Sequence, residues 1–389
     1  MPRFPVTSST IAALPGAVYS SLAQRLADFR GETYPLHIGD TWREPPVGCR
    51  MQDLHVEEHP GMHRYGPTQG LPALLEALSK RVSSRTGVAT ASDDLLITAG
   101  ATGGLAVAVG ALVEPGDEVL ILAPYWPLIA GIVSTFGACP VPVPLLDSAR
   151  GIEETASPEA VIERIEGATS AKSVALYVNT PNNPTGRLLP RPWLEAIAVW
   201  ARQRDLWLLS DEVYEDLIYD GEHQPMRPLA SERTISAHSF SKAYGMAGNR
   251  CGYLVAPPPI IAEMKKVGTH TYYAAPTAAQ LAALEALGPA GDTWLGEARR
   301  EYAKAGESAA RRLGAAAPRG STFLFLDVES ALDERGLVGF LEDLVGEGLL
   351  VSPGPSFGPF PTHVRVCFTA APPDVVERGI EILARRLGR

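Results

Sequence analysis

Hydrophobic residues in the middle of the chain occur in short runs that alternate with longer amphipathic segments. Apolar runs of roughly four to eight residues fit buried strands, and apolar positions spaced three or four apart fit helices. The pattern predicts strands at residues 95–99, 119–122, 173–178, 206–209, 234–238 and 252–256, and helices at 103–113 and 192–204. This alternation predicts an α/β fold with a mostly parallel sheet sandwiched by helices.

The pattern changes after Pro276, where an alanine-rich amphipathic segment predicts one long helix over residues 276–312. Beyond it, expected strands at 322–327 and 364–368 and helices at 336–346 and 373–387 indicate a smaller α+β domain. The first 46 residues are too few to fold alone, so we expect them to pack on that smaller domain. The expected division is an N-terminal segment at 1–46, a large domain at 47–285 and a small domain at 286–389.

Charge and cysteine content narrow the possible functions. The net charge of −10 argues against a nucleic-acid partner or an anionic membrane surface. The four cysteines are scattered singly, so neither a disulfide framework nor a metal site is expected, and a reducing cytoplasm fits. We also expect no signal peptide and no membrane-spanning segment, because no apolar run is long enough. The sequence therefore indicates a cytoplasmic protein.

Lys242 is the main candidate for chemistry. It follows a predicted strand and the hydroxyl residues Ser239 and Ser241, and it has Arg250 downstream. A partly desolvated lysine can form a Schiff base, and hydroxyls with a guanidinium suit phosphate oxygens. The alternative is a surface lysine after a serine-rich turn, which is the better interpretation of an isolated lysine.

Two more candidate groups follow the ends of predicted strands, where ligands bind in open α/β sheets. Asp211 can pair with a protonated ring nitrogen, and Tyr214 can donate to an oxygen on the same ring. Asn183 lies in the Asn-x-Pro-x-Asn-Pro-Thr-Gly segment at residues 179–186, where either X-Pro bond can be cis. The alternatives are a helix-capping aspartate, a buried tyrosine and an ordinary turn.

These motifs together resemble the class I and II aminotransferases of fold type I, which use pyridoxal 5'-phosphate. The motif at 179–186 is followed by Ser-Asp-Glu-Val-Tyr at 210–214 and by Ser-Phe-Ser-Lys at 239–242 with a downstream arginine. Each motif alone is weakly to moderately specific, but the three in this order are strongly specific. The resemblance covers about residues 39–365. It implies transfer of an amino group between an L-amino acid and a 2-oxo acid, in a homodimer with shared active sites.

The resemblance also implies roles for individual residues. Lys242 matches the lysine that holds the cofactor as a Schiff base, and Asp211 matches the partner of the pyridine nitrogen. Tyr214 and Asn183 match the pair that binds the ring oxygen. The implied phosphate ligands lie at a helix start and around the lysine. They are Ala101, Thr102, Ser239, Ser241 and Arg250.

Aromatic residues and an arginine are implied at the edges of the site. Trp126 resembles the aromatic that stacks on the pyridine ring, with Tyr125 as the alternative. Tyr65 resembles a tyrosine that reaches the phosphate of the partner subunit. Arg365 lies in an apolar strand where a charge needs a partner, and it resembles the arginine that binds the substrate carboxylate as a fork. A solvated edge-strand arginine is the alternative.

The substrate side chain is less well determined. Gly39 is an implied substrate contact and begins a segment that resembles the stretch closing over that side chain, although many relatives have Gly-Glu-Pro-Asp there. Thr102 supplies no second basic group for an acidic substrate, and Arg43 is a weak candidate. Residues 269–273 resemble a loop lining the partner's site; they are polar and aromatic, which permits an aromatic, hydroxylated or polar amino acid.

Two other functions remain open on the sequence alone. The same scaffold supports lyase, oxidase or cyclase chemistry on a modified amino acid, because the cofactor stabilises charge at Cα whichever bond changes next. A non-catalytic effector-binding domain, as in some transcriptional regulators, is more remote. Those regulators carry an N-terminal winged-helix domain, for which the residues before Gly39 are too few.

Overall fold

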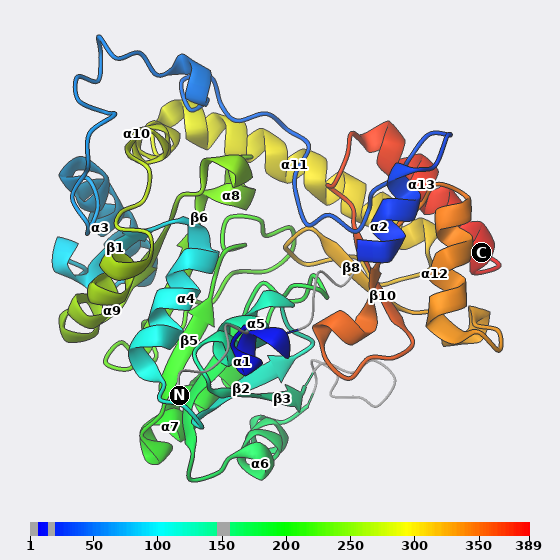
Figure 1. Ribbon diagram of the computed structural model, residues 1–389, viewed down its shortest axis with the longest axis horizontal. Coiled ribbons are helices and arrows are strands. Elements are labelled where there is room, and N and C mark those ends of the chain that lie inside the picture. Colours follow the sequence, from blue (N-terminus) through cyan, green and yellow to red (C-terminus); the bar gives the residue numbers. More distant parts are fainter. Residues whose placement is uncertain (1–6, 15–19, 146–155) are drawn as a thin grey trace, which may run out of the picture.

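The computed structural model describes residues 7–14, 20–145 and 156–389. Figure 1 shows a larger part built around one sheet and a smaller part at its side, with the long helix α11 (Pro289–Arg312) running from one to the other. Among the described residues, no helix is both long and apolar enough to cross a membrane.

The large sheet has seven strands in the order β1-β7-β6-β5-β4-β2-β3. Their bounds are Leu95–Thr98, Glu118–Ala123, Cys139–Pro144, Ser173–Asn179, Trp207–Asp211, Thr234–Ser239 and Gly252–Val255 for β1 to β7. Only β7 runs antiparallel to its neighbours, β1 and β6. The carboxyl ends of the parallel strands β4, β5 and β6 therefore meet at one edge of the sheet.

Helices cover both faces of this sheet because side chains alternate along its buried strands. One face of the sheet, which carries Ile121, is covered by α4 (Gly100–Leu112), α5 (Leu128–Thr135) and α9 (Pro258–Thr271). The opposite face, which carries Leu120, is covered by α6 (Pro158–Ala168) and α7 (Arg191–Arg204). The β1 and β7 end of that second face is covered by α3 (Pro72–Thr86) and α10 (Thr277–Ala286). This is the helix–sheet–helix sandwich that the sequence predicts.

The smaller part is built on an antiparallel sheet of β8 (Phe323–Asp327), β10 (His363–Cys367) and β9 (Ser352–Pro353). Helices α12 (Gly336–Gly346) and α13 (Pro373–Arg386) accompany it, and α2 (Ser20–Ala27) from the N-terminal segment lies beside α12 in Figure 1. The short helix α1 (Ser9–Ala12) precedes α2 in the chain. Leu26 of α2 packs on Val345 and Leu350 of this part, whereas α1 contacts α5 of the larger part.

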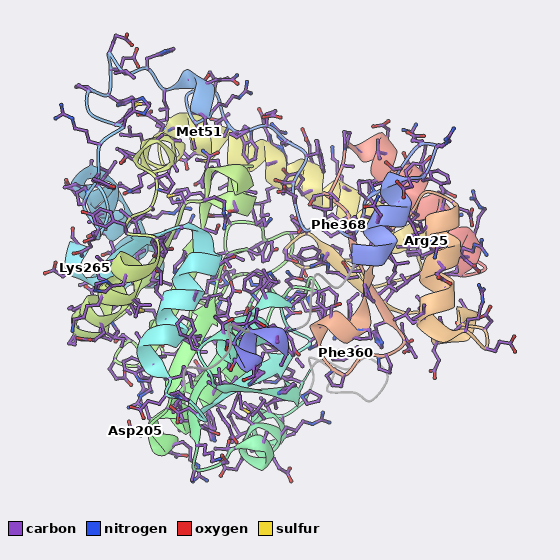
Figure 2. All side chains as sticks on the ribbon, in the orientation of Figure 1. Arg25, Met51, Asp205, Lys265, Phe360 and Phe368 are labelled. Carbon is purple, nitrogen blue, oxygen red and sulfur yellow. The ribbon has the colours of Figure 1, made fainter. Side chains whose placement is uncertain are left out.

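The two parts share a continuous core along α11. Phe368, labelled in Figure 2, lies against α11 so closely that a Cβ on Gly306 would meet its ring at 3.0 Å. In the same view Arg25 marks the helices of the smaller part, and Asp205 and Lys265 lie at the outer edge of the larger part.

Some element predictions are wrong. The single helix expected at 276–312 is two helices, because Gly288 is extended and Pro289 begins α11, where its missing N–H costs nothing. Most of the expected loop at 269–273 is the last turn of α9. Strand β3 was not predicted because its three prolines argue against a central strand; it is an edge strand, where proline is tolerated.

Candidate active site

The site forms where three parallel strands end side by side. Asn179, Asp211 and Ser239 are the last residues of β4, β5 and β6, and Asn179 pairs with Asp211 in register. The Asn179 Nδ2 donates to the Asp211 carbonyl at 2.9 Å, and its Oδ1 accepts from the Asn183 N–H at 2.7 Å. Asn179, which the sequence reasoning missed, thus ties the Asn183 loop to the aspartate. The peptide bonds before Pro181 and Pro184 are both cis.

Asp211 is buried, and its carboxylate is held on both oxygens. The Tyr177 hydroxyl donates to Oδ2 at 2.5 Å, and the Val213 N–H donates to Oδ1 at 3.4 Å. Burial raises the pKa of Asp211 to about 6, and the Tyr177 hydrogen bond acts in the opposite direction. Tyr214 is buried nearby, and burial raises its phenol pKa. The sequence placed Asp211 and Tyr214 correctly beside a strand end but did not single out Tyr177.

Lys242 lies on the one-turn helix α8 (Phe240–Ala243), directly after β6. Ser239 caps this turn, because its Oγ accepts from the Ser241 N–H at 3.0 Å. The Lys242 Nζ donates to the Gly39 carbonyl and lies 3.7 Å from Oδ1 of Asp40. Burial lowers the pKa of Lys242, which favours the free amine that nucleophilic chemistry needs.

An anion cradle lies at the start of α4. This helix has no side-chain cap and no acidic residue in its first turn, so the first amides, including those of Ala101 and Thr102, have no intrahelical partner. Gly100 has φ 71°, and a Cβ there would lie 2.4 Å from Nη2 of Arg250. Arg250 Nη1 donates to the Ala247 carbonyl at 2.9 Å, which fixes the guanidinium over this helix end. Helix amides and a guanidinium in this arrangement suit a phosphate group.

Arg365 projects from β10 toward the end of the large sheet and is only 5% exposed. Its Nη1 donates to Oδ1 of Asn183 at 3.0 Å, which joins the two parts of the molecule. Its Nη2 donates to the His37 carbonyl at 2.7 Å and to the Ser352 hydroxyl at 3.2 Å. The sequence indicated that a charge at this position needs partners. Residues from both ends of the chain supply them to Arg365.

Two aromatic rings pack against the guanidinium of Arg365. The Cζ of Arg365 lies 4.3 Å from the centroid of the Phe323 ring and 4.9 Å from that of Phe357. Gly39 is adjacent, because a Cβ there would come within 3.7 Å of Nη1 of Arg365 and 3.2 Å of the Phe323 ring. Nothing in the sequence pattern marked these two phenylalanines, which read as ordinary core residues.

The aromatic candidates differ in exposure. Tyr125 is buried and its N–H donates to the Phe357 carbonyl at 3.0 Å, whereas Trp126 is half-buried. Trp126 therefore has the more accessible ring. Tyr65 is 90% exposed and packs on Tyr273 with ring centroids 5.0 Å apart. A tyrosine so exposed in one chain agrees with a role toward a partner subunit.

A polar cavity of about 280 Å³ lies away from Lys242, under the sheet face that carries Ser236 and His238. Glu212, Glu215 and His238 lie close enough there to share a metal ion. Each carboxylate already has a partner: Glu215 lies 3.0 Å from His238 Nδ1 and 3.4 Å from Arg85 Nη1, and Glu212 lies 2.8 Å from His223 Nε2. We assign the cluster as an ion-pair network, and the absence of a metal stays a prediction.

Comparison with known proteins decides the family. The family described as aminotransferase class I and II matches residues 40–383. The chain belongs to this family. It is 34% identical over 332 residues to a probable aspartate/prephenate aminotransferase of Thermus aquaticus, covering 84% of each chain. It is 31% identical over 315 residues to an arginine–pyruvate transaminase of Pseudomonas aeruginosa, covering 79% of this chain and 78% of that one.

The fold comparison agrees. A solved tetra mutant of Thermus thermophilus aspartate aminotransferase, in complex with tryptophan, matches with a TM-score of 0.90 and 29% identity. The match covers 98% of this chain and 100% of that structure. The protein is therefore a fold type I α/β enzyme and an aminotransferase, which moves an amino group between an L-amino acid and a 2-oxo acid. Members of this family use pyridoxal phosphate.

Proposed function

We propose that this aminotransferase holds pyridoxal 5'-phosphate by a covalent bond to Nζ of Lys242, at the edge where β4, β5 and β6 end. One observation carries the proposal. A half-buried lysine of lowered pKa, a buried carboxylate and the uncapped start of α4 under Arg250 converge on this edge. Each matches one part of the cofactor, namely its aldehyde, its ring nitrogen and its phosphate.

The phosphate would be held by the first amides of α4 together with side chains around the lysine. Arg250 supplies the guanidinium, and the glycine at position 100 leaves room for close approach. The proposed phosphate ligands in this chain are Ala101, Thr102, Ser239, Ser241 and Arg250.

The ring would lie between Trp126 and the strand ends. Asp211, ionised, would hold the proton on the ring nitrogen, and Tyr214 and Asn183 would bind the ring oxygen. When bound, the cofactor supplies an electron-withdrawing ring that stabilises the charge left at the substrate Cα. Burial of Asp211 makes this ion pair strong because little water competes for it.

The substrate would be gripped at its carboxylate by Arg365, beside Asn183 and Gly39. The hydrogen bonds of Arg365 to Asn183, His37 and Ser352 hold the guanidinium in place before substrate arrives. Lys242 Nζ would then move the proton at Cα. Its lowered pKa supports this because the amine must be free to accept a proton.

Assembly and location are part of the same proposal. We propose a homodimer in which the exposed Tyr65 reaches the partner's phosphate, with no nucleic-acid or membrane partner. The four cysteines are all free thiols in the structure, which supports a cytoplasmic enzyme. The proposed domain division is 1–46, 47–285 and 286–389, with α11 as the link. The names of the relatives suggest aspartate, prephenate or arginine as substrates of the amino-group transfer.

Replacing Lys242 with alanine tests the proposal. We expect K242A to fold, to lose the visible absorbance of the covalently bound cofactor and to lose nearly all turnover. K266A is the matched control, because Lys266 is 67% exposed on α9 and pairs with Glu263 at the surface. Unchanged absorbance and activity in K242A would sink the assignment.

A single-turnover assay separates transamination from the other chemistries of the scaffold. With an amino acid and no acceptor, the enzyme should release one 2-oxo acid per site and no ammonia, and then stop until an acceptor is added. Continuous ammonia release would point to a lyase, and oxygen uptake to an oxidase.

A further inference from the structure

Asn179 is a buried residue at the end of β4 to which the proposed function gives no role. It is 3% exposed and pairs with Asp211 at the last register position between β4 and β5. Both strands end at this pair, so the sheet does not fix the backbone of the residues that follow. Those residues include Asn183, which the proposed function places at the cofactor ring. Their position must therefore come from other contacts.

The side chain of Asn179 makes hydrogen bonds in two directions. Its Nδ2 donates to the Asp211 carbonyl at 2.9 Å, and the same carbonyl accepts from the Thr180 N–H at 3.2 Å. Its Oδ1 accepts from the Asn183 N–H at 2.7 Å. An amide carries a donor and an acceptor in one plane, so this single side chain holds both neighbours at once.

The loop after β4 depends on such side-chain support because two of its residues lack a donor. Pro181 and Pro184 have no backbone N–H, so neither can bond to a neighbouring segment through that group. The Asn183 N–H lies between them, and a buried N–H without a partner is costly. Its bond to Asn179 therefore decides where Asn183 lies.

The chain of contacts continues into the smaller part of the molecule. Asn183 Oδ1 accepts from Arg365 Nη1 at 3.0 Å. One series of hydrogen bonds thus connects the arginine proposed for the substrate carboxylate with the aspartate proposed for the ring nitrogen. All its members are buried, and none is more than 5% exposed: Arg365, Asn183, Asn179 and Asp211. Because little water competes for these bonds, the loss of one leaves its partner unpaired.

We propose that Asn179 is a positioning residue that sets Asn183 against the cofactor ring and couples this contact to the backbone of Asp211. It acts through these two residues and binds no part of the cofactor itself. The inference rests on the proposed function, because that function assigns the ring oxygen to Asn183 and the ring nitrogen to Asp211. It adds that one buried amide fixes the distance between the two groups.

Replacing Asn179 with alanine should change the pH dependence of the visible absorbance of the holoenzyme. When Asn183 is displaced, the ring oxygen loses a donor and keeps more negative charge. That charge retains the proton on the nitrogen joined to Lys242, so the midpoint of the absorbance change should rise by roughly one pH unit. Spectrophotometric titration measures this without turnover. Titrating the apoenzyme with pyridoxal phosphate should show a Kd about tenfold higher.

N182A is the matched control. Asn182 is also 3% exposed and lies in the same loop, but its side chain bonds to Thr185 and to the carbonyls of Pro124 and Asn179. Both variants should lose stability in thermal unfolding, and only N179A should shift the absorbance midpoint. N179S, whose shorter side chain cannot span both bonds, should shift it in the same direction by less, and it replaces N179A if that variant does not fold.

Two results would overturn the proposal. One is an N179A or N179S midpoint equal to that of the wild type, and the other is an equal shift in N182A. In the second case the loop would need only an intact core and not this particular amide. Failure of the proposed function would differ from both, because the wild type itself would then bind no cofactor with visible absorbance.

Discussion

Burial has opposite effects on the two central ionisable residues. It lowers the pKa of Lys242, which yields a free amine, and it raises the pKa of Asp211 to about 6, which works against the ionised carboxylate. The second effect is unfavourable for holding a proton on the cofactor ring. The Tyr177 hydroxyl offsets it by donating to the carboxylate. In the proposed site, Tyr177 would thus be a positioning residue that acts through Asp211.

Replacing Tyr177 with phenylalanine should therefore raise the pKa of Asp211. The carboxylate loses a donor, so it takes up a proton at higher pH, and the acidic limb of the kcat/KM profile should move up by roughly one pH unit. Steady-state rates across pH measure this. Y244F is the control, because Tyr244 is also buried but its hydroxyl has no hydrogen-bond partner among the described residues. A Y177F profile that superimposes on that of the wild type would show that Tyr177 only packs.

At the scale of elements, the sequence predicted what depends on local pattern. The buried strands β1, β2 and β4 to β7 were predicted within a few residues, because apolar runs bounded by turns are a local signal. Asp211 and Lys242 were expected at the ends of such strands, and Asp211 is the last residue of β5 while Lys242 lies in the turn after β6. Helices α1 to α3, α5, α6, α8 and α9 and strands β3 and β9 were missed.

Replacing Gly100 with alanine tests whether the start of α4 binds the cofactor phosphate. A Cβ at φ 71° is strained and would also collide with the Arg250 guanidinium, so G100A should weaken binding of pyridoxal phosphate by about tenfold or more. Titrating the apoenzyme with cofactor measures this Kd. G87A is the matched control. Gly87 follows α3 with φ 69°, and a Cβ added there would have no described atom within 4 Å. Both variants should lose about 1 kcal/mol of stability, and only G100A should lose affinity. Equal affinity in the two variants would contradict the cradle.

At the scale of the whole molecule, the site is assembled from three distant stretches of chain. His37 and Asp40 come from the N-terminal segment, Lys242 from the large sheet, and Ser352 and Arg365 from the small sheet. The sequence motifs identified the chemistry of the central stretch. They could not show which side chains from the two ends would contact it, because that depends on how the two parts dock along α11.

The proposed dimer makes Tyr65 a residue of the partner's site, and complementation tests this. Y65A and K242A homodimers should each be nearly inactive. In a mixed dimer, one site pairs an intact Lys242 with an intact Tyr65, so an equal mixture that exchanges subunits freely should recover roughly a quarter of wild-type activity. If Tyr65 acts within its own chain, no mixture recovers activity, and the shared site is wrong. Activity measured after subunit exchange decides between these outcomes.

The central claim is that Lys242 carries the cofactor. The most direct measurement is reduction of the holoenzyme with borohydride, which makes the cofactor bond permanent, followed by proteolysis and mass spectrometry. The peptide containing Lys242 should carry the added mass of the reduced cofactor at that residue, and in K242A the cofactor should be lost on denaturation. Added mass on any other lysine, or none in the wild type, would contradict the account.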